Sequence, residues 1–456
     1  MKSGCKLAVL TAAVLLSLGL SATAFAGGRP DLVIKGLKAG VPHQQGELLV
    51  KFKDGTTASD QAVVARGLGA QKVQTVHGGG RGRGELALFR LPASVGVADA
   101  VEALAADPAV DYAEPNWIYT HSTFSNDPQF TSGALWGMYG ASGTPANQFG
   151  SGASLASSNN CGSVYVGIID EGYMFNHEDL AANAGKNPGD STFDGVDNDG
   201  NGKVDDVYGW DFAGGNNSVF DGTGDDHGTH VAGTIGGVGN NGKGVSGVCH
   251  SVKLINAKFL GSQGGTTANA IAAVDYMTDL KIKGLNLVGT NNSWGGGGFS
   301  QGLKDAIDRA GANDLLFIAA AGNSGANNDT TASYPSGYAS ANIIAVAALA
   351  SNGTLATYSQ YGATTVDICA PGSGIVSTVP VASGKGPKAT VTSGYASYNG
   401  TSMATPHVAG AAALYKALNG TASAATIKSA LLGKAAPTAS CNGKVVTNGR
   451  LDISTL

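Results

Sequence analysis

Beyond residue 120, short and mostly apolar runs alternate with helical segments, and this alternation constrains the fold more than any other feature of the sequence. The runs cover residues 164–169, 252–259, 285–290, 315–321 and 343–347. Strands that are apolar on both faces and separated by helices are typical of a parallel sheet. We therefore predict an α/β domain in which a parallel sheet is flanked by helices on both faces.

The chain before residue 120 has a different pattern, in which short strands and helices follow in the order βαββαβ. Strands are predicted at 47–52, 72–76, 85–91 and 110–113, and helices at 59–68 and 97–104. This order is that of a small ferredoxin-like α+β domain. We assign residues 27–46 to a linker, 47–119 to the small domain and 120–456 to the larger one.

Residues 1–26 have the pattern of a secretory signal peptide. Lys2 and Lys6 precede an apolar run at 7–20, and the sequence Ala-Phe-Ala at 24–26 has the small-x-small pattern of a cleavage site. The alternative, a transmembrane anchor, needs roughly 20 apolar residues, which is more than this run offers. We therefore expect a secreted protein without membrane attachment.

Cys5 would leave with the signal peptide, and four cysteines would remain: Cys161, Cys249, Cys369 and Cys441. An exported chain with four cysteines is expected to form two disulfides in one of three pairings. Cys161 and Cys249 each lie three residues before an apolar run, so they would meet if those runs were neighbouring parallel strands. This argument favours Cys161 with Cys249 and Cys369 with Cys441, and the other pairings stay open.

Three residues have the chemistry of an acyl-transfer site. Asp170 ends the run VYVGIID, His227 opens HGTHVAG, and Ser402 lies in NGTSMATPHVAG at the start of an alanine-rich helix. Acyl transfer needs an alcohol nucleophile, a base to take its proton and a carboxylate to orient that base. Taken singly, such a serine is more often a helix cap and such an aspartate a turn former. In combination, the three residues favour catalysis.

These runs, in the order Asp, His, Ser, resemble the signature blocks of the subtilisin-like serine proteases, thermitase-like bacterial members included. The resemblance extends from about residue 126 to the C-terminus. It implies that Ser402 attacks the peptide carbonyl, that His227 carries the proton and that Asp170 orients the imidazole. The block AAAGNSG makes Asn323 the side-chain donor of the oxyanion hole, with the backbone NH of Ser402 as its partner. Substrate-cleft residues are expected at Ser293, Trp294, Gly295, Gly296 and Gly322.

The small N-terminal domain also fits this family, whose members often carry a propeptide that assists folding and then inhibits the enzyme. The segment AEPNWIY, residues 113–119, resembles the family's junction with the mature enzyme. The last strand of the domain would lie extended in the active-site cleft. The alternative is a permanent accessory domain. We expect a monomeric endopeptidase made as a zymogen, with protein or peptide substrates, its own propeptide as intramolecular inhibitor, and broad specificity that includes large apolar side chains.

Glu171 departs from the family pattern, which usually has a small hydroxyl residue after the triad aspartate. The added negative charge would raise the pKa of His227 or weaken a local hydrogen bond. We therefore expect a shifted pH profile and not an inactive protein.

Calcium, with one or two structural sites, is the expected cofactor. The loop DGVDNDGNGKVDD has the EF-hand-like spacing of hard oxygen ligands, although Tyr208 stands where the bidentate glutamate belongs. Its candidate ligands are Asp197, Asp199, Asn201, Lys203, Asp205 and Asp206. The alternative for this loop is a solvated acidic turn. By resemblance, a second site would use the side chains of Asp127, Asp179 and Asn241 and the backbone carbonyls of Val238, Lys243 and Val245.

Other functions are less consistent with the sequence. A sedolisin-like acid peptidase needs a glutamate where His227 stands, and a lipase or esterase has an elbow serine that precedes its acid and histidine. A catalytically dead member that binds peptides or adhesion partners is a competing interpretation from a different class. The formal net charge of −5 provides no basic field, so nucleic-acid binding is not expected.

Overall fold

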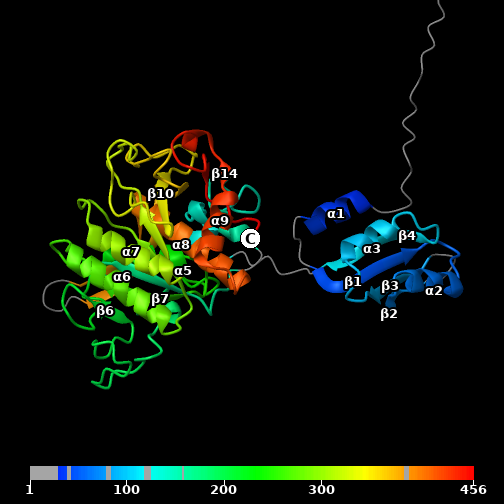
Figure 1. Ribbon diagram of the computed structural model, residues 1–456, viewed down its shortest axis with the longest axis horizontal. Helices are drawn as coiled ribbons and strands as arrows, with labels where there is room; N and C mark the ends of the chain where they lie inside the picture. Colours follow the sequence, from blue (N-terminus) through cyan, green and yellow to red (C-terminus); the bar gives the residue numbers. More distant parts are fainter. Residues whose placement is uncertain (1–28, 39–42, 79–83, 118–124, 157–158, 385–389) are drawn as a thin grey trace, which may run out of the picture. The chain divides into compact units, whose positions relative to one another are not determined.

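The computed structural model describes residues 29–38, 43–78, 84–117, 125–156, 159–384 and 390–456. It divides into two compact units, residues 1–121 and 122–456, shown in Figure 1. The predicted signal peptide and residues 118–119 of the predicted junction lie outside the described residues.

The first unit is a four-stranded antiparallel sheet in the order β2-β3-β1-β4. Its strands are β1 (His43–Phe52), β2 (Gln71–His77), β3 (Leu86–Arg90) and β4 (Val110–Trp117), and its predicted helices are α2 (Ala58–Gly67) and α3 (Val97–Leu104). Leu48 and Phe52 of β1 pack with Val101 and Leu104 of α3 in one buried core. The predicted βαββαβ order is therefore present.

The segment predicted as a linker, 27–46, differs from the prediction. It contains an additional helix, α1 (Pro30–Lys38), and the start of β1. Val33, Ile34 and Leu37 of α1 pack against the core of the small domain. This spacing places the three apolar side chains on one helical face, and that face is partly buried by tertiary contact.

The second unit contains a nine-stranded sheet in the order β14-β15-β11-β10-β9-β8-β5-β7-β6. Its strands are β5 (Tyr165–Asp170), β6 (Gly209–Asp211), β7 (Lys253–Lys258), β8 (Leu287–Asn292), β9 (Leu316–Ala320), β10 (Ile343–Leu349), β11 (Ile368–Pro371), β14 (Ala436–Pro437) and β15 (Gly449–Arg450). All neighbouring pairs are parallel except β14 and β15. Each predicted apolar run forms a strand of this sheet.

Helices cover both faces of the sheet (Figure 1). They are α5 (Asp226–Gly236), α6 (Thr267–Ile282), α7 (Gln301–Ala312), α8 (Thr401–Leu418) and α9 (Ala424–Gly433), and a short α4 (Pro128–Thr131) precedes the sheet. Adjacent residues of β5 point to opposite cores, because side chains alternate along a strand. Ile168 packs in the core that contains α5 and α8, and Ile169 in the core that contains α6 and α7.

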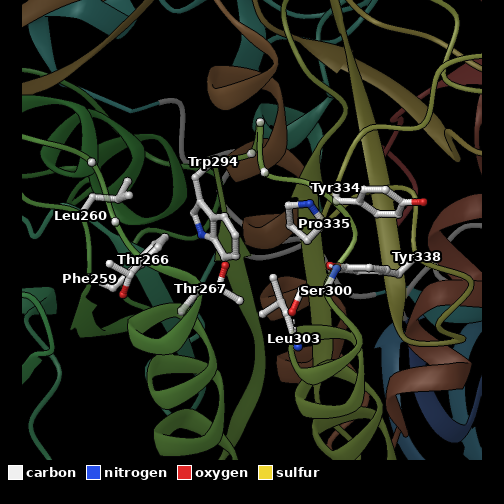
Figure 2. Close-up of a pocket in the computed structure, with 17 residues that line it drawn as sticks. Phe259, Leu260, Thr266, Thr267, Trp294, Ser300, Leu303, Tyr334, Pro335 and Tyr338 are labelled. Atoms are coloured by element: carbon white, nitrogen blue, oxygen red, sulfur yellow. Dashed lines mark hydrogen bonds between the residues drawn. The ribbon is translucent and has the colours of Figure 1, made fainter.

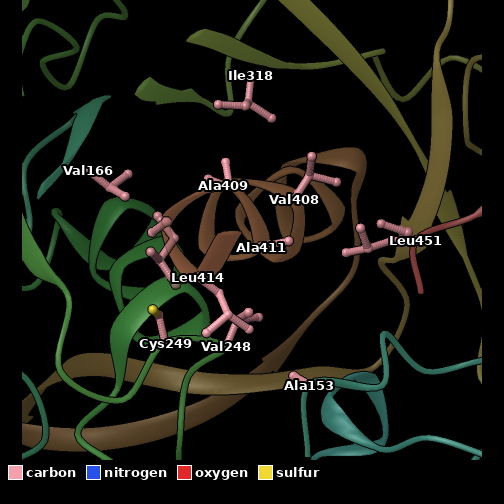
Figure 3. Close-up of a cluster of buried hydrophobic side chains, with 14 of the residues drawn as sticks. Ala153, Val166, Val248, Cys249, Ile318, Val408, Ala409, Ala411, Leu414 and Leu451 are labelled. Carbon is pink, nitrogen blue, oxygen red and sulfur yellow. The ribbon is translucent and has the colours of Figure 1, made fainter. Parts of the chain in front are cut away.

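Helix α8 is buried on almost all sides. Figure 3 shows its side chains Val408, Ala409 and Leu414 in one buried cluster with Val166 of the sheet and with Val248. The many alanines of α8 allow neighbouring elements to approach closely, so the helix passes through the core. Its N-terminus is thereby held firmly at one edge of the sheet.

The disulfides join Cys161 to Cys249 and Cys369 to Cys441, with Cα–Cα distances of 5.9 and 6.6 Å. This is the pairing that the sequence favoured. Strands β5 and β7 are neighbours and run parallel, which is the condition that this pairing required.

An antiparallel ribbon of β12 (Ile375–Ser383) and β13 (Thr390–Tyr398), which was not predicted, leads into α8. Among the described helices, none is long and apolar enough to span a membrane.

Candidate active site

The residues predicted for catalysis come together at the carboxyl edge of the parallel sheet. Asp170 is the last residue of β5, and Asn323 follows the end of β9. His227 and Ser402 are the second residues of α5 and α8. Ligand sites of open parallel sheets lie at this edge, because the loops after the strands gather there.

Asp170 holds the ring of His227. Its Oδ1 lies 2.9 Å from Nδ1 of His227, and the Asp170 side chain is fully buried while that of His227 is 30% exposed. A carboxylate on Nδ1 selects the tautomer in which Nε2 is free to accept a proton. Burial lowers the pKa of His227, but the charge and hydrogen bond of Asp170, with Glu171 and Asp226, raise it to about 9.

Ser402 lies in the first turn of α8. Its Oγ donates a hydrogen bond to the carbonyl of Ser293 (3.0 Å), and the Oγ of Ser293 donates to the carbonyl of Ser402 (2.9 Å). The hydroxyl proton of Ser402 is therefore engaged by Ser293 in this structure. Hydrogen bonds in substrate-free sites are often arranged differently from those in the reacting complex.

The side-chain amide of Asn323 has its Oδ1 fixed by hydrogen bonds and its Nδ2 available as a donor. Its Oδ1 accepts hydrogen bonds from the backbone NH (2.8 Å) and Oγ1 (3.0 Å) of Thr401. Nδ2 is therefore left as the donor, and it lies 3.6 Å from where a Cβ on Gly400 would stand. The backbone NH of Ser402 belongs to the first helical turn, whose amides have no partner inside the helix. The two donors can bind one oxyanion.

A cavity of about 290 Å³ opens beside Ser402. It is lined by Ser293, Trp294, Gly295, Gly296, Ala320, Gly322, Asn323, Ser324, Ser333, Gln360, Thr401 and Ser402. All the predicted cleft residues are among them, and none of the lining residues is charged. Sequence reasoning missed Ser333 and Gln360, which belong to loops without a motif. Gln360 is packed so closely on Gly322 that a Cβ there would lie 1.9 Å from its Oε1.

A second cavity, of about 360 Å³, shares Trp294, Gly295 and Gly296 with the first. Its other walls include Phe259, Leu303 and Tyr338, and Figure 2 shows these side chains around it. The lining combines aromatic and apolar side chains with glycines and the hydroxyl residues Thr266, Thr267 and Ser300. The sequence offered no signal for this cavity, because its walls come from three separate segments of the chain.

His230 lies one turn beyond His227 and has no access to solvent. Its ring stacks on Tyr398 with 4.5 Å between centroids, and its Nε2 lies 2.9 Å from the carbonyl of Ile375. Burial lowers the pKa of His230 to about 3. His230 is therefore a neutral packing residue.

The three side chains predicted for the second calcium site lie together. Asp127 and Asp179 are both fully buried, and Asn241 joins them: its NH donates to Asp127 (3.0 Å) and its Nδ2 to Asp179 (2.7 Å). Burial, followed by the like charge of Asp127, raises the pKa of Asp179 to about 6. The hydrogen-bond partners of these two buried carboxylates are neutral amides and the Ser125 hydroxyl. Asn241 presents its Nδ2 to Asp179, while its Oδ1 accepts from the NH of Lys243 (2.8 Å). The two carboxylates provide the hard oxygen ligands that calcium prefers.

The acidic loop at 194–206 is arranged differently. Asp197 and Asp199 accept hydrogen bonds from the backbone NH of Asn201, and Asp205 accepts from those of Asp194 and Gly195. Asp199 also lies 3.1 Å from Nζ of Lys283. Within the described ranges, no three His, Cys, Asp or Glu side chains form a group that could hold a metal ion.

Comparison with known proteins gives the same picture for both units. Residues 162–450 match the model of the subtilase family, and residues 32–116 match that of the fervidolysin N-terminal prodomain. An "Extracellular protease" of Xanthomonas campestris is 33% identical over 448 residues, covering 91% of this chain and 72% of that protein. Thermitase of Thermoactinomyces vulgaris is 36% identical over 295 residues, covering 63% of this chain and 84% of that protein.

A solved structure, of a protease from Pseudoalteromonas arctica, superposes with a TM-score of 0.56 at 30% identity, covering 73% of this chain and 98% of that one. The shared fold is a mainly parallel sheet between helices, as described above. The chain therefore belongs to the subtilase family of serine endopeptidases and carries a prodomain before its subtilisin-like domain.

Proposed function

We propose that this endopeptidase is secreted and hydrolyses proteins through an acyl-enzyme on Ser402. His227 takes the proton from Ser402 Oγ as it attacks the peptide carbonyl and returns it to the leaving amine. Asp170 keeps the imidazole in the required tautomer and stabilises the imidazolium. The Nδ2 of Asn323 and the NH of Ser402 stabilise the oxyanion.

The observation that carries this proposal is the short contact between Asp170 and His227 at the edge where α8 begins. The buried carboxylate holds a 30% exposed imidazole, and the helix-start serine and the amide donor line an uncharged cavity. Each group has one of the roles that acyl transfer requires.

The first unit, on this proposal, is a propeptide that is removed from the mature enzyme. The signal peptide would comprise residues 1–26, the propeptide 47–119 and the mature enzyme 120–456. The match of residues 32–116 to a prodomain model supports this division. The bound propeptide would inhibit the enzyme, which we expect to act as a monomer.

The proposed specificity is broad, with a preference for uncharged side chains before the scissile bond. The cavity beside Ser402 is lined by glycines and small polar groups, and none of its lining residues is charged. An acidic or basic side chain would lose its hydration there without gaining a partner. A large apolar side chain would displace water at little cost.

Calcium is proposed as a structural cofactor at Asp127, Asp179 and Asn241, with the carbonyls of Val238, Lys243 and Val245. Two buried carboxylates there support the proposal. The bound ion would neutralise their charge and favour the folded state by mass action. Ligation by the loop at 194–206 stays a prediction.

The test of the proposed function is the secreted product of the wild type and of Ser402→Ala. We expect the variant to lose casein hydrolysis and fluorophosphonate labelling and to retain residues of the first unit at its N-terminus, as read by N-terminal sequencing. Ser351→Ala is the control, because this serine is exposed in a turn after β10. Normal labelling and processing of Ser402→Ala would overturn the proposal and favour a non-catalytic role for this serine.

A further inference from the structure

Helix α5, which carries His227, does not cap its own N-terminus. Asp225 stands at the N-cap position and makes no side-chain capping bond. Its carboxylate is used elsewhere: Oδ1 accepts from Nζ of Lys258 (2.7 Å) and Oδ2 from the NH of Asp221 (2.6 Å). A helix start leaves its first amides without partners, and an aspartate at the N-cap usually supplies one.

Glu171, from a different element, takes the place of the missing cap. Its Oε1 accepts a hydrogen bond from the backbone NH of His227 (2.6 Å), and the NH of Gly228 lies 3.4 Å away. These are the second and third residues of α5, whose amides an N-cap side chain normally binds. The carboxylate also lies at the positive end of the helix dipole.

Two glycines allow the helix and the end of β5 to approach this closely. Gly172 has φ +103°, and a Cβ there would lie 2.5 Å from the carbonyl of Val219. A Cβ on Gly228 would lie 2.1 Å from the carbonyl of Gly172. The turn after Glu171 and the first turn of α5 therefore meet backbone to backbone.

Asp170 and Glu171, consecutive residues at the end of β5, thus both bind His227, at two different parts of that residue. Asp170 binds the ring of His227, and Glu171 binds its backbone. A ring held by a single bond can still move with its helix. With the backbone also held, the position of Nε2 relative to β5 is defined, and small errors in such a position reduce the rate strongly.

We propose that Glu171 is a positioning residue of this endopeptidase, which fixes the backbone of His227 relative to Asp170 and adds negative charge beside the imidazole. The proposal rests on the proposed roles of Asp170, His227 and Ser402. It concerns a residue where the family pattern has a small hydroxyl side chain, which is shorter than glutamate.

Other charged groups around His227 are already engaged. Asp226 accepts a hydrogen bond from the Tyr398 hydroxyl, and Lys258 lies between Asp221 (2.8 Å) and Asp225 (2.7 Å). Asp170 contacts the imidazole itself, and the nearby charge of Glu171 also raises the pKa of His227. Burial and the charge of Asp170 raise the pKa of Glu171 to about 7, so its charge increases through the neutral range.

The test compares Glu171→Gln with Glu171→Ala in the mature enzyme, by pH profiles of kcat and KM on an uncharged chromogenic peptide. Glutamine keeps the oxygen acceptor and removes the charge, so the acid limb of the profile should move to lower pH by about one unit. Alanine also removes the acceptor, so its plateau kcat should fall about 10-fold or more with KM within about twofold.

Asp279→Asn is the matched control, because it removes one exposed negative charge near the end of α6, at the opposite edge of the sheet. Its profile should match that of the wild type. Wild-type profiles for both Glu171 variants, or a shift shared equally by Asp279→Asn, would overturn the inference. If alanine prevents folding, the profile of the glutamine variant decides. An inactive Ser402→Ala together with an unshifted Glu171→Gln would reject this inference alone, whereas an active Ser402→Ala would reject the proposed function.

Discussion

Oδ1 of Asp170 lies 2.9 Å from Nδ1 of His227, with the carboxylate fully buried and the imidazole 30% exposed. The Nδ1 side of the ring is therefore held by a buried carboxylate, while the exposed part of the ring can reach a substrate.

Asp170→Asn should lower kcat by about 10⁴-fold with a much smaller change in KM. The amide can donate to Nδ1 and would then favour the tautomer with the proton on Nε2, which cannot accept one from Ser402. Thermal unfolding should show that the variant is folded, since the side chains have nearly equal volume. A kcat within tenfold of the wild type would contradict the assigned role.

Asn323→Ala should lower kcat by about 10²–10³-fold, the range found when the corresponding donor of subtilisin is removed. KM should change little, because the donor acts mainly on the oxyanion. Asn313→Ala, at the partly exposed C-cap of α7, serves as the control for loss of an asparagine. Equal kinetics of the two variants would show that Nδ2 of Asn323 does not face the oxyanion.

The wild-type kcat/KM should rise with pH through neutrality and level off on the alkaline side. His227 must be neutral to accept a proton, and its pKa is raised above 6.5 by Asp170 and the neighbouring carboxylates, which outweigh burial. A raised pKa leaves more imidazolium at neutral pH, so the acid limb moves to higher pH. The pH dependence of kcat/KM would be measured on an uncharged peptide, with the stability of the enzyme checked at each pH. An acid limb centred below pH 6 would contradict a raised pKa of His227.

Removal of calcium with a chelator should lower the melting temperature and speed autolysis. The free energy of unfolding should fall by about 2.7 kcal/mol relative to its value at a calcium concentration 100 times Kd. Asp127→Asn should abolish most of this dependence, because it removes one of two buried carboxylates at the site. The calcium dependence of the melting temperature of Asp197→Asn tests separately whether the loop at 194–206 binds calcium. Calorimetry on enzyme inactivated with a fluorophosphonate avoids autolysis, and an unchanged melting temperature would refute both sites.

Gly322→Ala should reduce stability and the rate on substrates with a large side chain before the scissile bond. Its φ is +111°, and the new Cβ would collide with Oε1 of Gln360 at 1.9 Å. Gly296→Ala is the matched control, because its φ is +102° but nothing lies within 4 Å of a Cβ. Comparing kcat/KM on peptides with Phe or Ala at that position separates backbone strain from the narrowed cavity. Equal losses in the two variants would point to strain alone.

The strands and the chemical groups were predictable because their signals are local. Apolar runs such as 164–169 and 315–321 became β5 and β9 within one or two residues, and the helix at 97–104 has the predicted bounds. Hydrophobic periodicity reports which faces are buried, whatever the partner. The disulfide partner of Cys161 followed from strand adjacency and was found as favoured.

The features that were missed depend on contacts between distant segments. Helix α1 was predicted as a linker because its short apolar face becomes significant only where the small domain covers it. The second cavity needs walls from three separate segments. The ribbon of β12 and β13 is an exception, because its two strands are close in the sequence and were simply not predicted.

The sequence by itself determined the fold class, the reactive residue types and the edge of the sheet at which they gather. Only the tertiary structure decided which partners these residues bind. Asp225 binds Lys258, Glu171 caps α5 in place of Asp225, and Ser402 donates a hydrogen bond to the carbonyl of Ser293. The physical reason is that a side chain's type sets what it can bind, whereas its partner is chosen by packing among residues far apart in the chain.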